Sequence, residues 1–348
     1  MTTPAPAPAP TEPQHVAVPL RQKLGWASGS ITDQFMANGI NSLALPIYNT
    51  SLGVSPILIS WALAVPRLFD AITDPLIGNM TDNARTRWGR RKPFILGGAI
   101  GCAITFALIW MPPRSLGHTG LFVFFLLMSL LYNLAYTFFA VPRQALGYEM
   151  SPDYKERTNI FAINAIVASF AGLVMPWMYK LSFHPMLAGE AKDEVIGVRW
   201  VGIMVAVLII VTSLPVVLLA RGRFAGIAQE KIGLLRATRL TLANRPFQIV
   251  TGVVVFALLA VMLVGPLNLC INIYYICGGN KELGAYWGGW AGTAQAASGI
   301  VATPIVAILA NRIGKRTTIG LGIGLAIVAH VSSWWPSARS TPGYKSSS

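Results

Sequence analysis

Charged residues are scarce in this chain. Asp, Glu, Lys and Arg make up 11% of its 348 residues, whereas soluble domains contain about a quarter. Hydrophobic residues make up 54%, and the mean hydropathy is +0.56. This composition excludes an ordinary water-soluble domain, because there is too little charge to cover its surface. The sequence therefore predicts a chain whose outer surface faces a lipid bilayer.

Acidic residues and cysteines are few. There are 13 Asp and Glu against 27 Lys and Arg, which gives a formal net charge of +14. The cations lie mainly in short segments between apolar runs, which argues against nucleic acid as a partner. Cys102, Cys270 and Cys277 lie within apolar runs and show neither a disulfide framework nor metal-ligand spacing. We expect no cofactor.

Long apolar runs are abundant. A membrane-spanning helix takes about 20 residues, and nine such runs fall near 25–48, 55–81, 93–113, 119–147, 157–182, 199–220, 247–276, 284–310 and 317–335. With a cytoplasmic N-terminus, eighteen Lys and Arg lie in inside segments and seven in outside segments, which is the usual positive-inside bias. The sequence predicts an all-α, multi-pass protein of the plasma (inner) membrane, and we expect a monomer.

Two features divide the chain. A basic loop at 221–245 separates six runs from three, and the motif GNMTDNARTRWGRR (78–91) has a counterpart, AILANRIGKR (307–316), six runs later. Repeated halves of this kind are typical of transporters. We predict a disordered Pro/Ala-rich tail (1–20), a six-helix bundle (21–222), a cytoplasmic linker (223–245), a partial second bundle of three helices (246–335) and a polar tail (336–348).

Three ionisable residues lie inside the second apolar run. Arg67, Asp70 and Asp74 have the spacing i, i+3, i+7 and share one helix face. Each charge in hydrocarbon costs at least about 2.5–3.5 kcal/mol, so this face must meet the protein interior or a water-filled cavity. One interpretation is a structural Arg–Asp pair, which leaves the second carboxylate unpaired. The other is a site for Na⁺ or a proton between the two carboxylates.

The fourth apolar run offers further oxygen ligands. Asn133 and Thr137 lie four residues apart on one face, and hard cations prefer carboxylate, carbonyl and hydroxyl oxygens. Helix–helix hydrogen bonding is the alternative role for these two side chains. Arg143, which follows Pro142, is either functional or a residue that snorkels or forms a salt bridge near the cytoplasmic end.

Three segments carry a family resemblance. RLFDAITDPLIGNMTDNARTRWGRRKPFIL (67–96), YTFFAVPRQALGYEMSPDYKERT (136–158) and KLGWASGSITDQF (23–35) resemble the glycoside–pentoside–hexuronide:cation symporters of the major facilitator superfamily. The resemblance implies the major facilitator fold, with about nine of an expected twelve transmembrane helices present. It also implies Na⁺- or H⁺-coupled symport of a sugar or glycoside-like solute by alternating access.

The resemblance assigns residues one by one. Asp70, Thr73, Asp74 and Thr137 match the family's cation-site positions, and Arg67 matches the arginine beside them. The sugar-contacting positions differ: the family's first-span acid aligns with Gln34, next to Asp33, its fourth-span acid with Ala140, a fourth-span aromatic with Gln144 and a fifth-span arginine with Ala165. The candidate residues for a substrate cavity are Asp33, Gln34, Asn133, Tyr136, Arg143 and Gln144.

The loop after the second run is a candidate gate. Its charged and glycine positions are Asp82, Arg85, Arg87, Gly89, Arg90 and Arg91. Charge pairs here could hold two helix ends together in one state and release them in another. The alternative is that the basic residues only fix topology.

Two other functions were weighed. An intramembrane Mg²⁺-dependent prenyltransferase would need two acidic clusters, and the second half offers only Glu230 and Glu282, singly. The abruptly polar tail after Trp335 suggests a frameshift, a truncated gene or a fragment. On that interpretation the 348-residue chain is an inactive transporter fragment, and we expect it to take up little solute.

Overall fold

The computed structural model describes residues 17–113, 115–189, 193–222, 243–245, 247–249, 251–253, 255–256, 271–314, 317–318, 320–325 and 328, with backbone alone at 154, 155, 303, 304, 307, 310 and 311. The chain divides into two compact parts, residues 1–294 and 295–348. Every regular element among the described residues is helical, which confirms the predicted all-α class.

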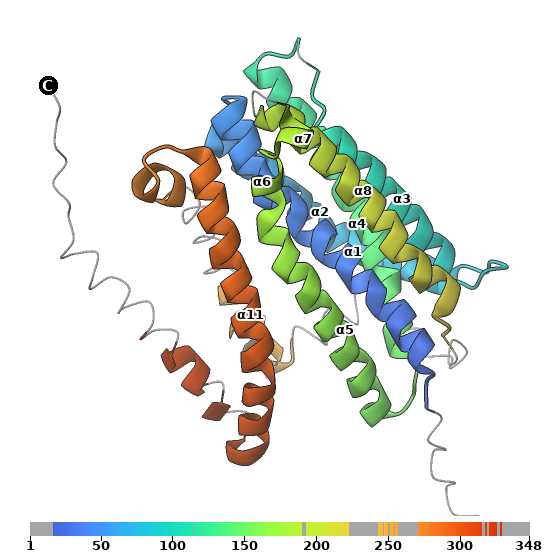
Figure 1. Ribbon diagram of the computed structural model, residues 1–348. Helices are drawn as coiled ribbons and strands as arrows, with labels where there is room; N and C mark the ends of the chain where they lie inside the picture. Colours follow the sequence, from blue (N-terminus) through green and yellow to red (C-terminus); the bar gives the residue numbers. More distant parts are fainter. Residues whose placement is uncertain are drawn as a thin grey trace, which may run out of the picture. The chain divides into compact units, whose positions relative to one another are not determined.

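The first part is a helical bundle (Figure 1). Its elements are α1 (Leu20–Ala44), the π-helical η1 (Leu45–Ser51), α2 (Pro56–Asn83), α3 (Lys92–Ile109), α4 (His118–Glu149), α5 (Tyr154–Val174), η2 (Met175–Trp177), α6 (Met178–Leu181), α7 (Pro185–Ala188), α8 (Glu194–Leu219), η3 (Ile271–Ile276) and the start of α11 (Lys281–Ile313). In the second part, the described residues are the remainder of α11, residue 314, and helical residues at 317–318, 320–325 and 328.

Helices cover the first six predicted membrane spans. Five of them are long and apolar enough to cross a membrane, namely Pro56–Asn83, Lys92–Ile109, His118–Glu149, Glu156–Leu181 and Glu194–Leu219. The eighth predicted span is α11. The seventh and ninth spans, the linker 223–245 and the tail 336–348 lie wholly or largely outside the described residues.

The predicted N-terminal tail (1–20) is described only at its end. There the backbone N–H of Val18 donates to Oε1 of Glu156 at 2.7 Å, and Lys23 pairs with the same carboxylate at 2.9 Å. Helix α1 begins two residues after Val18, at Leu20. The entry of the chain into the bundle is therefore fixed against the start of α5.

Small residues let the inner helices approach closely. α3 packs against α4 and α8, and α1 against α5 and α8. A Cβ atom at Gly98 would lie 2.4 Å from the backbone nitrogen of Phe139, and one at Gly101 would lie 3.0 Å from Cβ of Ala135. Contact through small residues is the usual way in which membrane helices associate, because lipid removes most of the hydrophobic drive between them.

Pro142 interrupts the hydrogen bonding of α4. The residue lies within the helix, and its missing N–H leaves the carbonyl of Phe138 without the usual i+4 donor. The backbone hydrogen bonding of α4 is therefore interrupted between the segment that carries Asn133 and Thr137 and the last turns, which carry Arg143.

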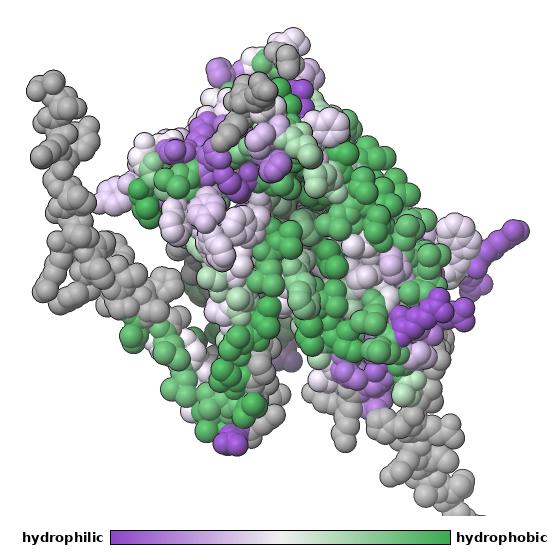
Figure 2. All heavy atoms as spheres, in the orientation of Figure 1, coloured by the Kyte–Doolittle hydropathy of each residue, from purple (hydrophilic) through white to green (hydrophobic). Residues whose placement is uncertain are grey.

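The outer surface is apolar. Large side chains on α2 and α8, including Leu68, Phe69, Ile72, Val211 and Leu218, are more than half exposed. Figure 2 shows hydrophobic residues covering the middle of the bundle on the face drawn, and hydrophilic residues gathering towards its ends. This pattern is that of a protein surrounded by lipid.

Candidate functional site

The charged face of α2 meets α4. Nδ2 of Asn133 donates to Oδ1 of Asp70, and also to the backbone carbonyl of Pro66 at 3.1 Å. Nη1 of Arg67 lies 3.8 Å from Oδ2 of Asp70, a longer and weaker pairing. The predicted neighbours Arg67, Asp70 and Asn133 are thus brought together. Asp74 and Arg67 are exposed and Asp70 is half-buried, so this face opens outward in the described part of the chain.

Thr137 joins the two carboxylates. Its side chain is buried and forms a side-chain interaction with both Asp70 and Asp74, while its Oγ1 lies 3.2 Å from the carbonyl oxygen of Asn133. A hydroxyl has one proton and two lone pairs. Thr137 can therefore donate to only one of these three acceptors at a time, and its oxygen remains able to face a cation.

Thr73 bonds within its own helix, as Thr137 does. Its Oγ1 donates to the backbone carbonyl of Phe69 at 3.1 Å, within its own helix. A ligand that the sequence did not suggest lies nearby: Pro75 has no N–H, so the carbonyl of Ala71 lacks its helical donor. This carbonyl is a further oxygen close to Asp70 and Asp74 in sequence. The presence of Pro75 in the sequence could have indicated it.

A second polar cluster joins α1, α4 and α5. The hydroxyl of Tyr136 donates to Oδ1 of Asp33 at 3.1 Å, and Nη2 of Arg143 donates to Oδ1 of Asn164 at 3.0 Å. The guanidinium of Arg143 stacks 5.2 Å from the ring centre of Trp26. Asp33 and Tyr136 both act electrostatically on Arg143. Arg143 is thus held inside the bundle, with 4% of its surface exposed.

The two glutamines of the predicted cavity do not join this cluster. Oε1 of Gln34 accepts from Nδ2 of Asn38 at 3.1 Å, one turn along the same helix, and both side chains are accessible. Gln144 is exposed. Their neighbours in sequence, Asp33 and Arg143, carry the interhelical contacts instead.

The loop at 84–91 forms a charge cluster with α4. Nη2 of Arg91 lies 2.8 Å from Oδ1 of Asp82 and 2.7 Å from Oε1 of Glu149, and Arg90 binds the same carboxylate. Burial lowers the pKa of the Arg91 guanidinium from its ordinary value, and the charges of Glu149 and Asp82 oppose that change. Gly89 has φ +94°, a conformation that favours glycine. Arg85 and Arg87 are exposed. Glu149 was not among the predicted residues.

A third charge cluster lies at the other end of the bundle. Oε1 of Glu194 accepts from Ser51 at 2.5 Å and from Lys281 at 2.7 Å, and Oε2 accepts from Tyr179 at 2.9 Å. Nζ of Lys281 also reaches the carbonyl of Thr50 at 2.9 Å. These contacts tie the start of α11 to three elements of the bundle, and sequence reasoning missed them.

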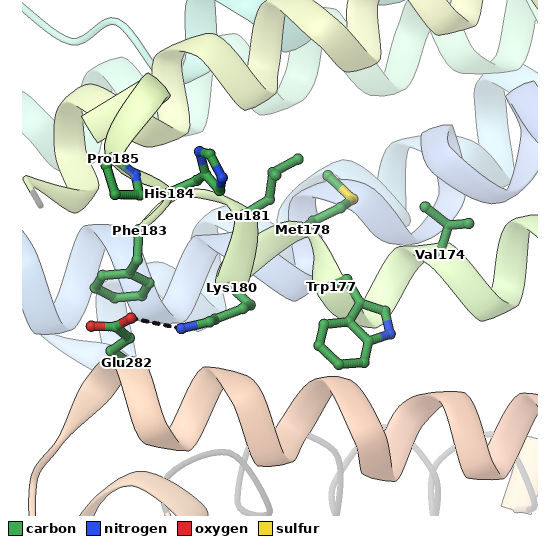
Figure 3. Close-up of a pocket in the computed structure, with 9 residues that line it drawn as sticks. All are labelled: Val174, Trp177, Met178, Lys180, Leu181, Phe183, His184, Pro185 and Glu282. Atoms are coloured by element: carbon green, nitrogen blue, oxygen red, sulfur yellow. Dashed lines mark hydrogen bonds and ion pairs between the residues drawn. The ribbon is translucent and has the colours of Figure 1, made fainter. Parts of the chain in front are cut away.

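A pocket of about 270 Å³ lies beside this cluster (Figure 3). Lys180 reaches from the α5–α6 segment to Glu282 at the start of α11, with 2.7 Å between Nζ and Oε1. Most of the pocket wall is apolar. The lining residues are Val174, Trp177, Met178, Lys180, Leu181, Phe183, His184, Pro185 and Glu282.

No group of three or more His, Cys, Asp and Glu side chains within the described residues could hold a metal ion. The Asp70–Asp74 region brings two carboxylates close to hydroxyl and amide oxygens, the atoms that hard cations prefer.

These features define a class of protein, a polytopic membrane transporter. The helices are long enough to cross a membrane, they hold carboxylates and guanidiniums between them, and charge clusters lie at both of their ends. A family model described as "MFS/sugar transport protein" matches residues 25–343, and the chain belongs to that family. The fold is accordingly the major facilitator fold. Since the family consists of transporters, the prenyltransferase alternative is set aside.

Curated relatives point the same way. The chain is 34% identical over 143 residues to an uncharacterized symporter of Synechocystis, which is 40% of this chain and 26% of the relative. It is 30% identical over 156 residues to a putative glycoside/cation symporter of Escherichia coli (45% and 34%), and 22% identical over 330 residues to an isoprimeverose transporter of Lactiplantibacillus pentosus (91% and 64%). The chain spans less than two thirds of the length of each of these relatives.

Proposed function

We propose that this chain is part of a secondary transporter that moves a sugar or glycoside-like solute together with Na⁺ or H⁺ by alternating access. The observation that carries the proposal is the position of Thr137 on α4, next to both Asp70 and Asp74 of α2. An oxygen site built across two helices can change its affinity when the helices move, which is what coupling requires.

The count of interior charges supports a single coupling ion. α1, α2 and α4 carry three carboxylates in their middle parts, on Asp33, Asp70 and Asp74, against the guanidiniums of Arg67 and Arg143. With all five ionised, one negative charge remains. A charge at membrane depth is costly without a partner, and one monovalent cation or one proton neutralises it. We therefore propose one coupling ion for each transport cycle.

The contacts at the two helix ends fit alternating access. The clusters around Glu149 and Glu194 lie at opposite ends of the bundle, because α4 ends at Glu149, one membrane-length helix (Glu156–Leu181) follows, and α8 then begins at Glu194. With the N-terminus placed in the cytoplasm, Glu149 lies inside and Glu194 outside. We propose that each cluster closes one side of the protein in part of the cycle.

The wider arrangement follows from this proposal. We place the protein in the plasma (inner) membrane as a monomer with a cytoplasmic N-terminus. A six-helix bundle (21–222) would be followed by a cytoplasmic linker (223–245) and a second bundle that begins at 246. Solute and coupling ion would lie between the two bundles, as in other transporters built from repeats.

The substitution Asp74→Asn tests the cation site. It preserves the side-chain shape and removes one charge, so we expect saturable binding of radioactive ²²Na⁺ to the purified protein, or proton-dependent binding if H⁺ is the coupling ion, to disappear. In proteoliposomes we expect the loss of cation-driven accumulation of isoprimeverose and lactose, the solutes named for two relatives.

The control is Asp193→Asn at the start of α8. Asp193 accepts from the backbone N–H of Val195 at 2.9 Å, and Asn caps a helix equally well. This control should bind the cation like the unaltered protein. Undiminished cation binding and accumulation in Asp74→Asn would show that the coupling site lies elsewhere and that the α2 charges are structural.

A further inference from the structure

A largely apolar pocket lies where residues 174–185 meet the start of α11 (Figure 3). Its volume is about 270 Å³, close to the lower end of the range for ligand sites, roughly 300–1,000 Å³. Val174 and Leu181, which line it, are 58% and 36% exposed. In the described part of the chain, the pocket therefore reaches the apolar outer surface.

The pocket lies at the ends of helices. The apolar span Glu156–Leu181 ends in it, and Glu282 belongs to the first turn of α11. Trp177 packs edge-on against Tyr286 and Trp290, with ring centres 6.1 and 5.5 Å apart. Trp and Tyr are enriched where a membrane protein meets the lipid headgroups. The pocket is therefore at the level where acyl chains give way to headgroups.

The pocket wall is rigid and suits an alkyl chain. Nε1 of Trp177 donates to Oγ1 of Thr293 at 2.7 Å, so the indole N–H is satisfied by the protein and the ring faces α11. Met178 and Phe183 are 4% and 7% exposed, which holds them in place. A wall of this kind favours apolar groups, because polar groups lose their hydration there without finding partners.

Charged groups of both signs stand beside this wall. Nζ of Lys180 lies 2.7 Å from Oε1 of Glu282, and the two side chains are 29% and 35% exposed, so a headgroup has access to each. His184 adds a donor. Its Nδ1 accepts from the backbone N–H of Met186 at 3.3 Å, so the neutral ring carries its proton on Nε2.

We propose that this pocket binds one phospholipid whose headgroup carries a primary ammonium, such as phosphatidylethanolamine. One acyl chain lies along the apolar wall, the phosphate accepts from Lys180 and His184, and the ammonium donates to Glu282. Two ion pairs then replace one. Phosphatidylcholine has no N–H to donate, and phosphatidylglycerol offers no cation to Glu282, so both bind more weakly. The inference requires only a bilayer around the helices and does not rest on the proposed symport.

Competition between lipids tests the inference. The purified full chain is placed in detergent micelles with equal amounts of dioleoyl phosphatidylethanolamine, phosphatidylcholine and phosphatidylglycerol, and native mass spectrometry identifies the lipid that it retains. We expect at least about fivefold more of the ethanolamine lipid than of either other lipid, because hydrogen bonds between charged groups are the strong ones. Glycerophosphoethanolamine has the same headgroup without acyl chains, and it should not displace the lipid at equal concentration.

Variants separate the contributions of the two charges. Glu282→Gln should abolish the preference for phosphatidylethanolamine over phosphatidylcholine, whereas Glu282→Asp retains the carboxylate and should retain the preference. Lys180→Gln should weaken the retention of all three lipids, because all three carry the phosphate. Asp193→Asn is the control, since Asp193 caps α8 at the same end of the bundle but does not line the pocket. It should behave like the unaltered protein.

Three results overturn the inference: equal retention of the ethanolamine and choline lipids, stronger retention of phosphatidylglycerol, or displacement by glycerophosphoethanolamine. An unchanged preference in Glu282→Gln does so as well. The competition is measured without Na⁺ or solute, and Asp74→Asn should leave it unchanged. Its result is therefore independent of the ²²Na⁺ experiment that tests the proposed symport.

Discussion

Nζ of Lys281 lies 2.7 Å from Oε1 of Glu194, and this ion pair joins the first turn of α11 to the first turn of α8. The two residues come from segments on opposite sides of the basic linker. Because the Glu194 carboxylate also accepts from Ser51 and Tyr179, it joins α8 to groups from three other elements. In the proposed topology this contact closes the outer side.

Replacing Lys281 by Gln should open the outer side of the protein more often. The partly exposed pair contributes about 1 kcal/mol at most, which corresponds to about a fivefold change in population. The measurement is the rate at which a membrane-impermeant maleimide labels Ala37→Cys from outside, with the three native cysteines replaced. Ala37 lines a small cavity with Arg67 and Asn133.

Lys281→Arg preserves the charge and serves as the control for that experiment. Its labelling rate should equal that of the parent. If Lys281→Gln is labelled no faster than Lys281→Arg, the ion pair does not contribute to closure.

Removing the Thr137 hydroxyl should weaken the cation site. Thr137→Ala deletes the one side chain that contacts both carboxylates, and a lost ligand of this kind costs about 1.5 kcal/mol, or about tenfold in affinity. Titration with ²²Na⁺ measures the change. Thr137→Ser retains the hydroxyl and should retain most of the affinity. Identical affinities in the two variants would assign Thr137 to helix packing alone.

Gly98→Ala should destabilise the bundle. The added Cβ would lie 2.4 Å from a backbone atom of α4, which cannot move as a flexible side chain can, so we expect a loss of about 1–3 kcal/mol. Thermal unfolding in detergent reports it. Gly97→Ala is the adjacent control, since a Cβ there meets nothing within 4 Å. Equal unfolding temperatures for the two variants would contradict the close α3–α4 contact.

In the loop cluster, Glu149→Gln should have a larger effect than Asp82→Asn. Glu149 is 16% exposed and binds both Arg90 and Arg91, whereas Asp82 is 55% exposed and binds Arg91 alone. Losing the more buried carboxylate leaves two guanidiniums without their main counter-charge. Labelling of an inward-facing cysteine should therefore increase more in Glu149→Gln. The opposite order would favour the interpretation that these charges only fix topology.

The sequence predicts well what depends on spacing along one helix. Arg67, Asp70 and Asp74 share a face of α2 because the helical repeat requires it, and Thr137 reaches them because α2 packs against α4. The resemblance also places Thr73 at the cation site, which stays a prediction; its hydroxyl donates to the carbonyl of Phe69. The residue pattern does not show which acceptor a threonine hydroxyl donates to.

Contacts between distant segments could not be predicted in this way. Ser51 and Glu194 are 143 residues apart, and Arg90 and Glu149 are 59 apart. Glu149 and Glu194 both lie at helix ends, where a charge usually indicates only an exposed surface. Their partners depend on how the helices are arranged in the membrane. The periodicity of residues within one helix carries no information about that arrangement.

Pro142 gives α4 a mechanical role beyond carrying ligands. Thr137 lies five residues before it and Arg143 directly after it, so the proposed ion site and the buried Arg143 are on opposite sides of the interruption in the helix. At 1.5 Å per residue they are about 9 Å apart along the axis. A small change of bend at Pro142 alters the angle between the two groups without any rearrangement of the bundle. Bending of α4 at Pro142 can therefore couple the two positions through a single helix.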